Sequence, residues 1–291
     1  MNACAACRPH AALARVNLAA LVVGALAFRA YGPALAAPFA LVAFLAFAVA
    51  GAAVVCWVGR ISVLELAFAQ MAGVACIAHG SGPFALFAFA KVSATALCAA
   101  AFAQRAHGGR QKTWVLAALI FSLAGDAWLL DKAYFAAGLG CFLIAHICYI
   151  GALAVDGGAR PSTPALAVFA LCAGLVAYRI WPNLATPMKA PVVVYMATLA
   201  TMSAVAFARA RKLGGAAWLV WLGSLSFVLS DSALALDRFA GRSVWLMAAV
   251  LPLYYLAQAL LTFFIATGDQ RIVSRNQSAM DSIASSSVKP S

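Results

Sequence analysis

Charged residues are scarce in this chain of 291 residues: only 10% of the sequence is charged, and Asp and Glu together number eight. Soluble globular domains carry charge on about a quarter of their residues, so an ordinary soluble domain, a secreted disulfide module and a disordered chain are all excluded. A net charge of +12 would suggest nucleic acid in a soluble protein. Here the basic residues lie mostly between apolar runs, as membrane topology requires, so we expect no nucleic acid partner.

Apolar residues make up 66% of the sequence and gather in long runs. A charge-free apolar run of about 20 residues spans a bilayer as a helix. The ten spans we predict are residues 12–30, 34–58, 61–79, 82–104, 113–131, 134–154, 162–181, 190–209, 215–236 and 244–267. The sequence therefore predicts an all-α, polytopic transmembrane bundle of about ten spans. The polar, Ser-rich residues 268–291 have too little apolar surface to pack, which predicts a disordered cytoplasmic tail.

Basic residues are divided unequally between the two sides of these spans. The side that holds both termini and the even-numbered loops carries 13 Lys and Arg, the other side carries six, and Lys91 lies within a span. The positive-inside rule then places both termini in the cytoplasm. A cleaved signal peptide ending at the Ala-Leu-Ala motif of residues 34–36 is an alternative, although Arg29 interrupts the approach to that site.

The cysteine and histidine residues do not predict a metal site. Cys4 and Cys7, followed by His10, have the spacing of half a zinc site, but no second CxxC or HxxxH supplies the other ligands. Six of the eight cysteines lie inside apolar runs, where a thiol behaves as a small hydrophobic group. The sequence also lacks a G-x-S-x-G elbow, an HExxH motif and a P-loop.

Two carboxylates lie deep in predicted spans, Asp126 and Asp231. A charge in the bilayer costs at least a few kcal/mol, so such residues are functional candidates by default. At 1.5 Å per residue, each acid lies roughly 8 Å below the outer end of its span, so both fall in one layer. Other polar residues of the apolar runs complete the candidate site: Lys91, Ser122, His146, Tyr149, Tyr195, Ser230, Tyr254 and Gln258. We expect a polar cavity that opens outward between five helices.

Two further patterns bear on this site. Thr95 lies four residues after Lys91 on the same helix face. The segments at 123–127 and 142–146 resemble those at 228–232 and 254–258, which suggests two parallel four-helix halves. A purely structural alternative is that Lys91 only neutralises one aspartate in a buried pair. That pair would leave the other acid and His146 without a role.

The same positions resemble the YhhN-like lysoplasmalogenase family. The resemblance rests on Lys91, Phe121-Ser122-Leu123-Ala124-Gly125-Asp126-x3-Leu130, Gly138-x3-Phe142-x3-His146-x2-Tyr149, Gly223-x3-Phe227-x2-Ser230-Asp231 and Tyr254-Tyr255-x2-Gln258. Their order and spacing match the family's eight-helix unit over residues 61–267. Residues 1–60 would then be two additional N-terminal transmembrane helices.

The resemblance implies hydrolysis of the vinyl ether bond of a lysoplasmalogen, without a cofactor, in the inner membrane of a bacterium. The products would be a fatty aldehyde and glycerophospho-ethanolamine or -choline, and the partners are this lysophospholipid and the membrane lipids. Protonation of the vinyl β-carbon creates an oxocarbenium ion that water captures, which calls for one protonated acid and one carboxylate. Asp126 and Asp231 suit these roles in either order. Lys91 suits the phosphate as a point charge, and Tyr195 and Tyr254 suit headgroup oxygens.

A proton-coupled transporter is the alternative function, because it also needs paired intramembrane acids, a histidine and repeated halves. The two functions differ in what they require of the membrane. An enzyme releases aldehyde in detergent, whereas a transporter needs a sealed membrane.

The predicted sidedness can be tested with topology reporters. Reporters fused after residue 270 and inserted in the loop at residues 105–112 should both report cytoplasm, because both positions lie on the basic side. A periplasmic signal from either position would overturn the sidedness and, with it, the outward opening of the cavity.

Overall fold

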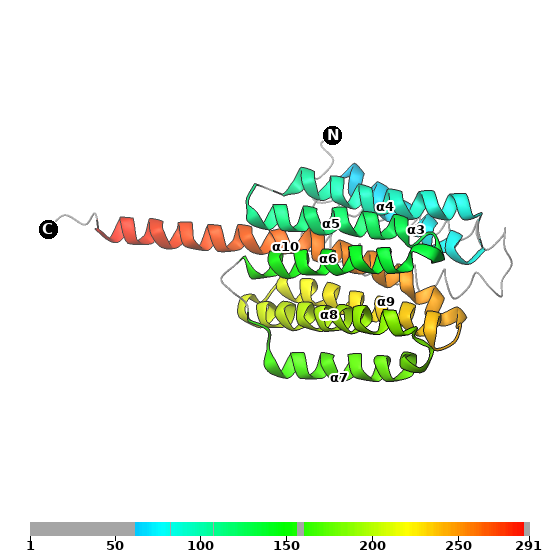
Figure 1. The fold of residues 1–291 in the computed structure, drawn as a ribbon. Helices are drawn as coiled ribbons and strands as arrows, with labels where there is room; N and C mark the ends of the chain where they lie inside the picture. Colours follow the sequence, from blue (N-terminus) through cyan, green and yellow to red (C-terminus); the bar gives the residue numbers. More distant parts are fainter. Residues whose placement is uncertain (1–61, 82, 107, 156–159, 288–291) are drawn as a thin grey trace.

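The computed structural model describes residues 62–81, 83–106, 108–155 and 160–287. These residues form eight α-helices and two short 3-10 turns, and the described part contains no strand (Figure 1). The helices are α3 (Val63–Ser81), α4 (Phe84–Arg105), α5 (Arg110–Trp128), α6 (Phe135–Ala154), α7 (Thr163–Ile180), α8 (Thr186–Leu213), α9 (Ala217–Phe239) and α10 (Val244–Ser287). The turns are η2 (Lys132–Tyr134) and η3 (Trp181–Asn183).

Most of these helices are long and apolar enough to cross a membrane. Six meet that description, by length and composition: α4, α8, α9, α6 extended by η2, α7 extended by η3, and the first 22 residues of α10. The apolar part of α3 is shorter, and α5 carries Arg110, Lys112 and Asp126. The chain is therefore an all-helical, multi-pass membrane protein. The predicted count of ten spans is not confirmed, because the first two predicted spans lie in residues 1–61, outside the described residues.

The eight described helices coincide with the eight predicted spans from residues 61–79 onward, and the differences lie at their ends. Helix α8 begins at Thr186 rather than at residue 190, because Pro187 occupies its first turn, where no backbone donor is lost. It ends at Leu213, before Gly214, whose φ of 66° closes the helix in the left-handed region.

Helix α10 continues well beyond its predicted span. It is helical through Ser287 and extends out of the bundle (Figure 1), which differs from the disorder predicted for residues 268–291. A helix already nucleated in the membrane can propagate through polar residues, and no proline interrupts the chain between Pro252 and Pro290.

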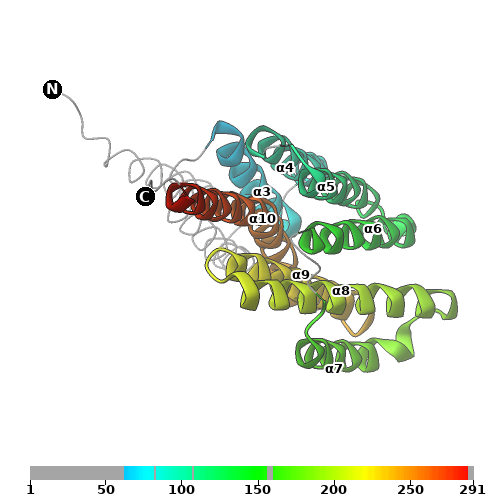
Figure 2. The same cartoon turned by 90° about the vertical axis from the view of Figure 1, so that its left-hand side faces the viewer.

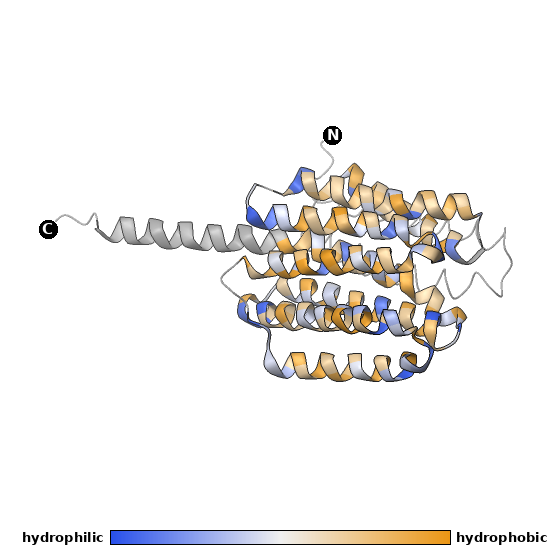
Figure 3. Ribbon diagram, viewed as in Figure 1, coloured by the Kyte–Doolittle hydropathy of each residue, from blue (hydrophilic) through white to orange (hydrophobic). Residues whose placement is uncertain are grey.

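Helix α10 forms the centre of the bundle and α7 its edge. Helix α10 packs against α9, α3, α4 and α5, whereas the main packing of α7 is on α8, α9 and η3 among the described elements (Figure 2). In their membrane-crossing segments, 83% of the α10 residues are buried inside the protein but only 6% of the α7 residues. Apolar residues cover the helix bodies, and polar residues gather mostly at the two ends of the bundle (Figure 3).

Two glycines allow the helices that carry the predicted acids to approach their neighbours closely. A Cβ at Gly223 of α9 would lie 2.8 Å from the Leu260 Cβ and 3.0 Å from the Leu261 backbone nitrogen of α10. A Cβ at Gly125 of α5 would lie 2.7 Å from the ring of Phe142 on α6. Small residues at such contacts bring transmembrane helices together, so Gly125 and Gly223 set the spacing of α5 from α6 and of α9 from α10.

The contact at Gly223 can be tested by adding one methyl group. Gly223→Ala should lower the melting temperature in detergent, because overpacking against backbone costs about 1–3 kcal/mol. Gly174→Ala on α7 is the matched control, since its Cβ would have no neighbour within 4 Å. Alanine favours a helix by about 1 kcal/mol over glycine, so the control should be neutral or stabilising. Equal melting temperatures for the two variants would contradict the close α9–α10 contact.

Candidate active site

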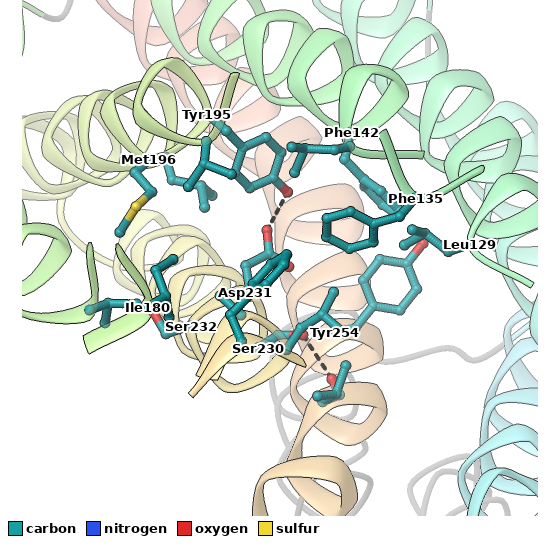
Figure 4. Close-up of a pocket in the computed structure, with 18 of the residues that line it drawn as sticks. Leu129, Phe135, Phe142, Ile180, Tyr195, Met196, Ser230, Asp231, Ser232 and Tyr254 are labelled. Atoms are coloured by element: carbon teal, nitrogen blue, oxygen red, sulfur yellow. Dashed lines mark hydrogen bonds between the residues drawn. The ribbon is translucent and has the colours of Figure 1, made fainter. Parts of the chain in front are cut away.

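A cavity of about 90 Å³ lies at the end of the bundle where α5, α7 and α9 end and α6, α8 and α10 begin (Figure 4). Since one water occupies roughly 10–15 Å³ on this measure, the cavity has room for several waters or a small part of a lipid. Its walls are largely apolar. Its polar lining includes six of the residues predicted from the sequence: Lys91, Asp126, Tyr195, Ser230, Asp231 and Tyr254. The structure thus brings both aspartates to one cavity.

The Asp126 carboxylate on α5 is surrounded by a cation and two hydroxyl donors. The Lys91 ammonium lies 3.3 Å from the Asp126 Oδ1 and donates a hydrogen bond of 3.3 Å to the Asp126 backbone carbonyl. The hydroxyls of Thr95 and Tyr254 donate to Oδ2 at 2.5 Å and 2.6 Å. The Asp126 side chain is 1% exposed and that of Lys91 is 8% exposed. Complete burial disfavours a charged carboxylate, and the cation and two hydroxyl donors around it act against that cost and favour the ionised form.

Behind Tyr254, two more polar residues extend this cluster away from the cavity. The Gln258 amide donates to the Tyr254 hydroxyl at 3.1 Å, and the Tyr149 hydroxyl donates to the Gln258 Oε1 at 2.5 Å. Both residues are buried and neither lines the cavity. Gln258 and Tyr149 therefore orient the Tyr254 hydroxyl toward Asp126 instead of facing the cavity themselves.

Asp231 on α9 has different surroundings. The Tyr195 hydroxyl donates to the Asp231 Oδ2 (Figure 4), and the His146 Nε2 lies 3.0 Å from the Tyr195 hydroxyl and 3.5 Å from that same carboxylate oxygen. The Asp231 side chain is 16% exposed, whereas His146 is completely buried. Within the described residues, no Lys or Arg lies within 4.0 Å of the Asp231 carboxylate. Asp231 is thus the more accessible acid, and a histidine takes the place that a lysine has beside Asp126.

Two aromatic rings lie between the two clusters. The Phe227 ring of α9 has its centroid 4.6 Å from that of His146 and 5.5 Å from that of Tyr254. The Phe142 ring of α6 lies 5.7 Å from Tyr254 and 6.5 Å from His146. These apolar rings fix the orientation of both clusters, and they entered the sequence analysis only as parts of the family motifs.

The remaining predicted residues have structural contacts. The Ser230 hydroxyl donates to the Val250 backbone carbonyl at 2.8 Å and so joins α9 to α10. The Ser122 hydroxyl is buried and has no hydrogen-bond partner in the described part of the chain. Thr95, whose hydroxyl contacts Asp126, was recognisable from the sequence only by its position one turn from Lys91.

The contacts of the two acids follow the suggested duplication. Asp126 on α5 is contacted from the preceding helix α4 and from α10, and Asp231 on α9 is contacted from the preceding helix α8 and from α6. If α3–α6 and α7–α10 are the two halves, the helices α4, α5 and α6 of the first half correspond to α8, α9 and α10 of the second. Each acid therefore receives one partner from its own half and one from the last helix of the other half.

Comparison with known proteins agrees with these motifs. A model described as the YhhN family matches residues 86–265, a range that contains every site residue named above. The chain belongs to the YhhN family. The family membership confirms the resemblance drawn from Lys91, Asp126, His146 and Asp231.

Relatives in this family come from bacteria and mammals. A protein of Mycobacterium bovis named Lysoplasmalogenase is 36% identical over 186 residues, which are 60% of this chain and 68% of that protein. Lysoplasmalogenase TMEM86A of Bos taurus is 34% identical over 159 residues, covering 51% of this chain and 63% of its own length. Lysoplasmalogenase TMEM86B of Mus musculus is 33% identical over 167 residues, covering 57% and 69%. No solved structure shows significant similarity to this chain.

The Lys91–Asp126 pair should dominate the stability of the cavity floor. Lys91→Met leaves a buried carboxylate without its cation, which should lower the free energy of unfolding by about 3–5 kcal/mol. Lys91→Met combined with Asp126→Asn removes both charges and should recover most of that loss. Lys132→Met, which removes an exposed lysine, is the control for thermal unfolding in detergent. A Lys91→Met protein as stable as the native one would show that the pair does not hold the helices together.

Proposed function

We propose that this protein is an integral membrane lysoplasmalogenase, which hydrolyses the vinyl ether bond of a lysoplasmalogen to a fatty aldehyde and a glycerophospho-ethanolamine or -choline. The names of its relatives support the reaction. The observation that carries the proposal is that two carboxylates with opposite electrostatic surroundings line one cavity of a membrane bundle. Vinyl ether hydrolysis needs such a pair, since one group must give a proton and another must remain an anion.

The surroundings of the two acids support a division of roles between them. Asp126 is the permanent anion, because the Lys91 ammonium and two hydroxyl donors stabilise its charge. Asp231 is the acid, because it faces the cavity without a lysine or arginine beside it and its carboxyl lies within reach of Tyr195 and His146. The sequence alone left this order open.

The reaction would proceed in balanced steps. Asp231 transfers its proton to the vinyl β-carbon, and the ether oxygen donates electron density to form the oxocarbenium ion. Water adds to the cationic carbon and gives a proton back to the ionised Asp231, which yields a hemiacetal. The hemiacetal then collapses to the aldehyde and the free glycerol hydroxyl. One water is consumed and both carboxyls return to their starting states, as general acid–base catalysis requires.

The residues around the two acids would serve these steps without reacting, His146 from a buried position outside the cavity lining. Tyr195 and His146 hold the Asp231 carboxyl in position and provide a hydrogen-bonded route for its proton. Asp126 with Tyr254 places negative charge beside the developing oxocarbenium ion, where preorganised electrostatics contribute most to catalysis. The apolar walls admit the lipid while limiting the water that reaches the cation.

The transporter alternative receives no support from the curated relatives named above, which are hydrolases by name. The two functions can be separated by experiment. The purified protein in detergent should release aldehyde from lysoplasmalogen, whereas transport would require a sealed membrane.

The two aspartates should act as a unit. Asp126→Asn and Asp231→Asn each keep the side-chain shape but cannot carry the same charge and proton, so each should reduce aldehyde release by roughly 10²–10⁴-fold. The double variant should release aldehyde only a little more slowly than the slower single variant, because the effects of residues that serve one step are non-additive. The native rate should show a bell-shaped pH dependence that reports the pair.

Asp131→Asn is the matched control, because this carboxylate lies at the same end of the bundle, is exposed, and caps a short turn instead of lining the cavity. It should retain native turnover. Near-native aldehyde release from a well-folded Asp231→Asn protein would contradict the two-carboxylate mechanism and would show that Asp231 contributes only to packing.

A further inference from the structure

The rim of the cavity carries basic side chains that the proposed mechanism does not use. Arg238, in the last turn of α9, places its guanidinium 4.0 Å from the centroid of the Phe135 ring and 5.8 Å from that of Phe239. Both rings line the cavity. The guanidinium also donates to the Lys132 backbone carbonyl at 3.3 Å, which holds it at this edge. Arg238 is therefore an exposed cation held against two rings that line the cavity.

The positive charge at this rim has no carboxylate partner. Arg242 lies close enough to Arg238 for their charges to interact electrostatically. The carboxylates of the two nearby acids accept hydrogen bonds from the backbone: Asp131 from the Ala133 N–H and Asp237 from the Ser243 N–H, each at 2.9 Å. Across the described residues, no rim cation forms a salt bridge. Two arginines whose charges interact and that form no salt bridge favour the binding of an anion, and phosphate matches the planar guanidinium donors best.

Lys91, which also lines the cavity, already forms an ion pair with Asp126. Its ammonium pairs with the Asp126 carboxylate and the Asp126 backbone carbonyl, and it is almost completely buried. Drawing it toward a phosphate would leave the buried Asp126 carboxylate without its cation, which is strongly unfavourable. The structure therefore favours Arg238 over Lys91 as the partner of a lipid phosphate.

The spacing of the rim from the acid fits a lysophospholipid. Asp231 and Arg238 are seven residues apart on α9, which corresponds to about 10 Å along the helix. In a lysoplasmalogen, seven covalent bonds separate the vinyl β-carbon from the phosphorus, which spans about 8 Å at the roughly 1.2 Å per bond of an extended chain. A phosphate at the Arg238 guanidinium would thus place the reacting carbon near the Asp231 carboxyl.

We propose that Arg238, together with Arg242, binds the phosphate of the lysophospholipid headgroup at the cavity rim and thereby sets the depth at which the vinyl ether meets Asp231. This inference rests on the proposed function for the identity of the lipid. The phosphate site itself requires only a lysophospholipid that enters the cavity from this end.

The test uses a ligand that the protein cannot cleave. An alkyl-ether lysophosphocholine has the headgroup and chain but no vinyl bond to protonate, and the alkylglycerol of the same chain lacks the phosphate. Arg238→Gln should weaken binding of the lysophosphocholine to the purified protein by about five- to tenfold, while binding of the alkylglycerol stays unchanged. Arg238→Lys should retain part of the affinity, since it keeps the charge but not the planar fork. Arg211→Gln, at the opposite end of the bundle, should change neither affinity.

Different results separate the two proposals. Equal weakening for both lipids would overturn the phosphate site, because it would show that Arg238 only maintains the shape of the cavity. Unchanged binding of the lysophosphocholine would overturn it directly, even if the native protein releases aldehyde from lysoplasmalogen. Selective loss of lysophosphocholine binding would support the site even if no vinyl ether is cleaved, in which case the proposed function fails alone.

Discussion

The ion pair between Lys91 and Asp126 is the interaction on which the rest of this membrane bundle depends. An isolated charge in the apolar interior costs several kcal/mol, so the two side chains must meet with good geometry or the helices cannot pack. Their 3.3 Å contact fixes α4 against α5, and the hydroxyl of Tyr254 brings in the central helix α10. The close approach of α9 to α10 at Gly223 then carries the second acid to the same cavity.

The two acids gain opposite properties from these surroundings. Asp126 is enclosed by donors and a cation, and Gln258 and Tyr149 hold the most important hydroxyl donor from behind. Asp231 has a tyrosine and a histidine instead of a lysine, and its side chain remains partly accessible. In the proposed mechanism, this cavity offers a fixed anion and an acid that can exchange its proton. Glycosidases use the same division of labour between two carboxyls for chemistry that passes through an oxocarbenium ion.

Much of this arrangement could be predicted from the sequence, because apolar runs and intramembrane charges are strong local signals. The positions of the eight described helices and the depth of Asp126 and Asp231 follow from spacing alone. The sequence could not show which acid Lys91 meets, since that depends on how α4, α5 and α9 pack. For the same reason it placed Tyr149 and Gln258 in the substrate site, although they lie behind Tyr254. Helical continuation of α10 through a polar segment also has no sequence signal as strong as an apolar run.

The proposed mechanism requires one carboxyl that gives a proton and one that remains an anion. Infrared spectroscopy measures this directly, because a protonated carboxyl has a carbonyl stretch that an ionised carboxylate lacks. The account predicts that the native protein shows a protonated buried carboxyl at neutral pH, that its signal disappears in Asp231→Asn, and that it persists in Asp126→Asn. A native protein without that signal, or a signal that disappears in Asp126→Asn instead, would contradict the assignment of Asp231 as the acid.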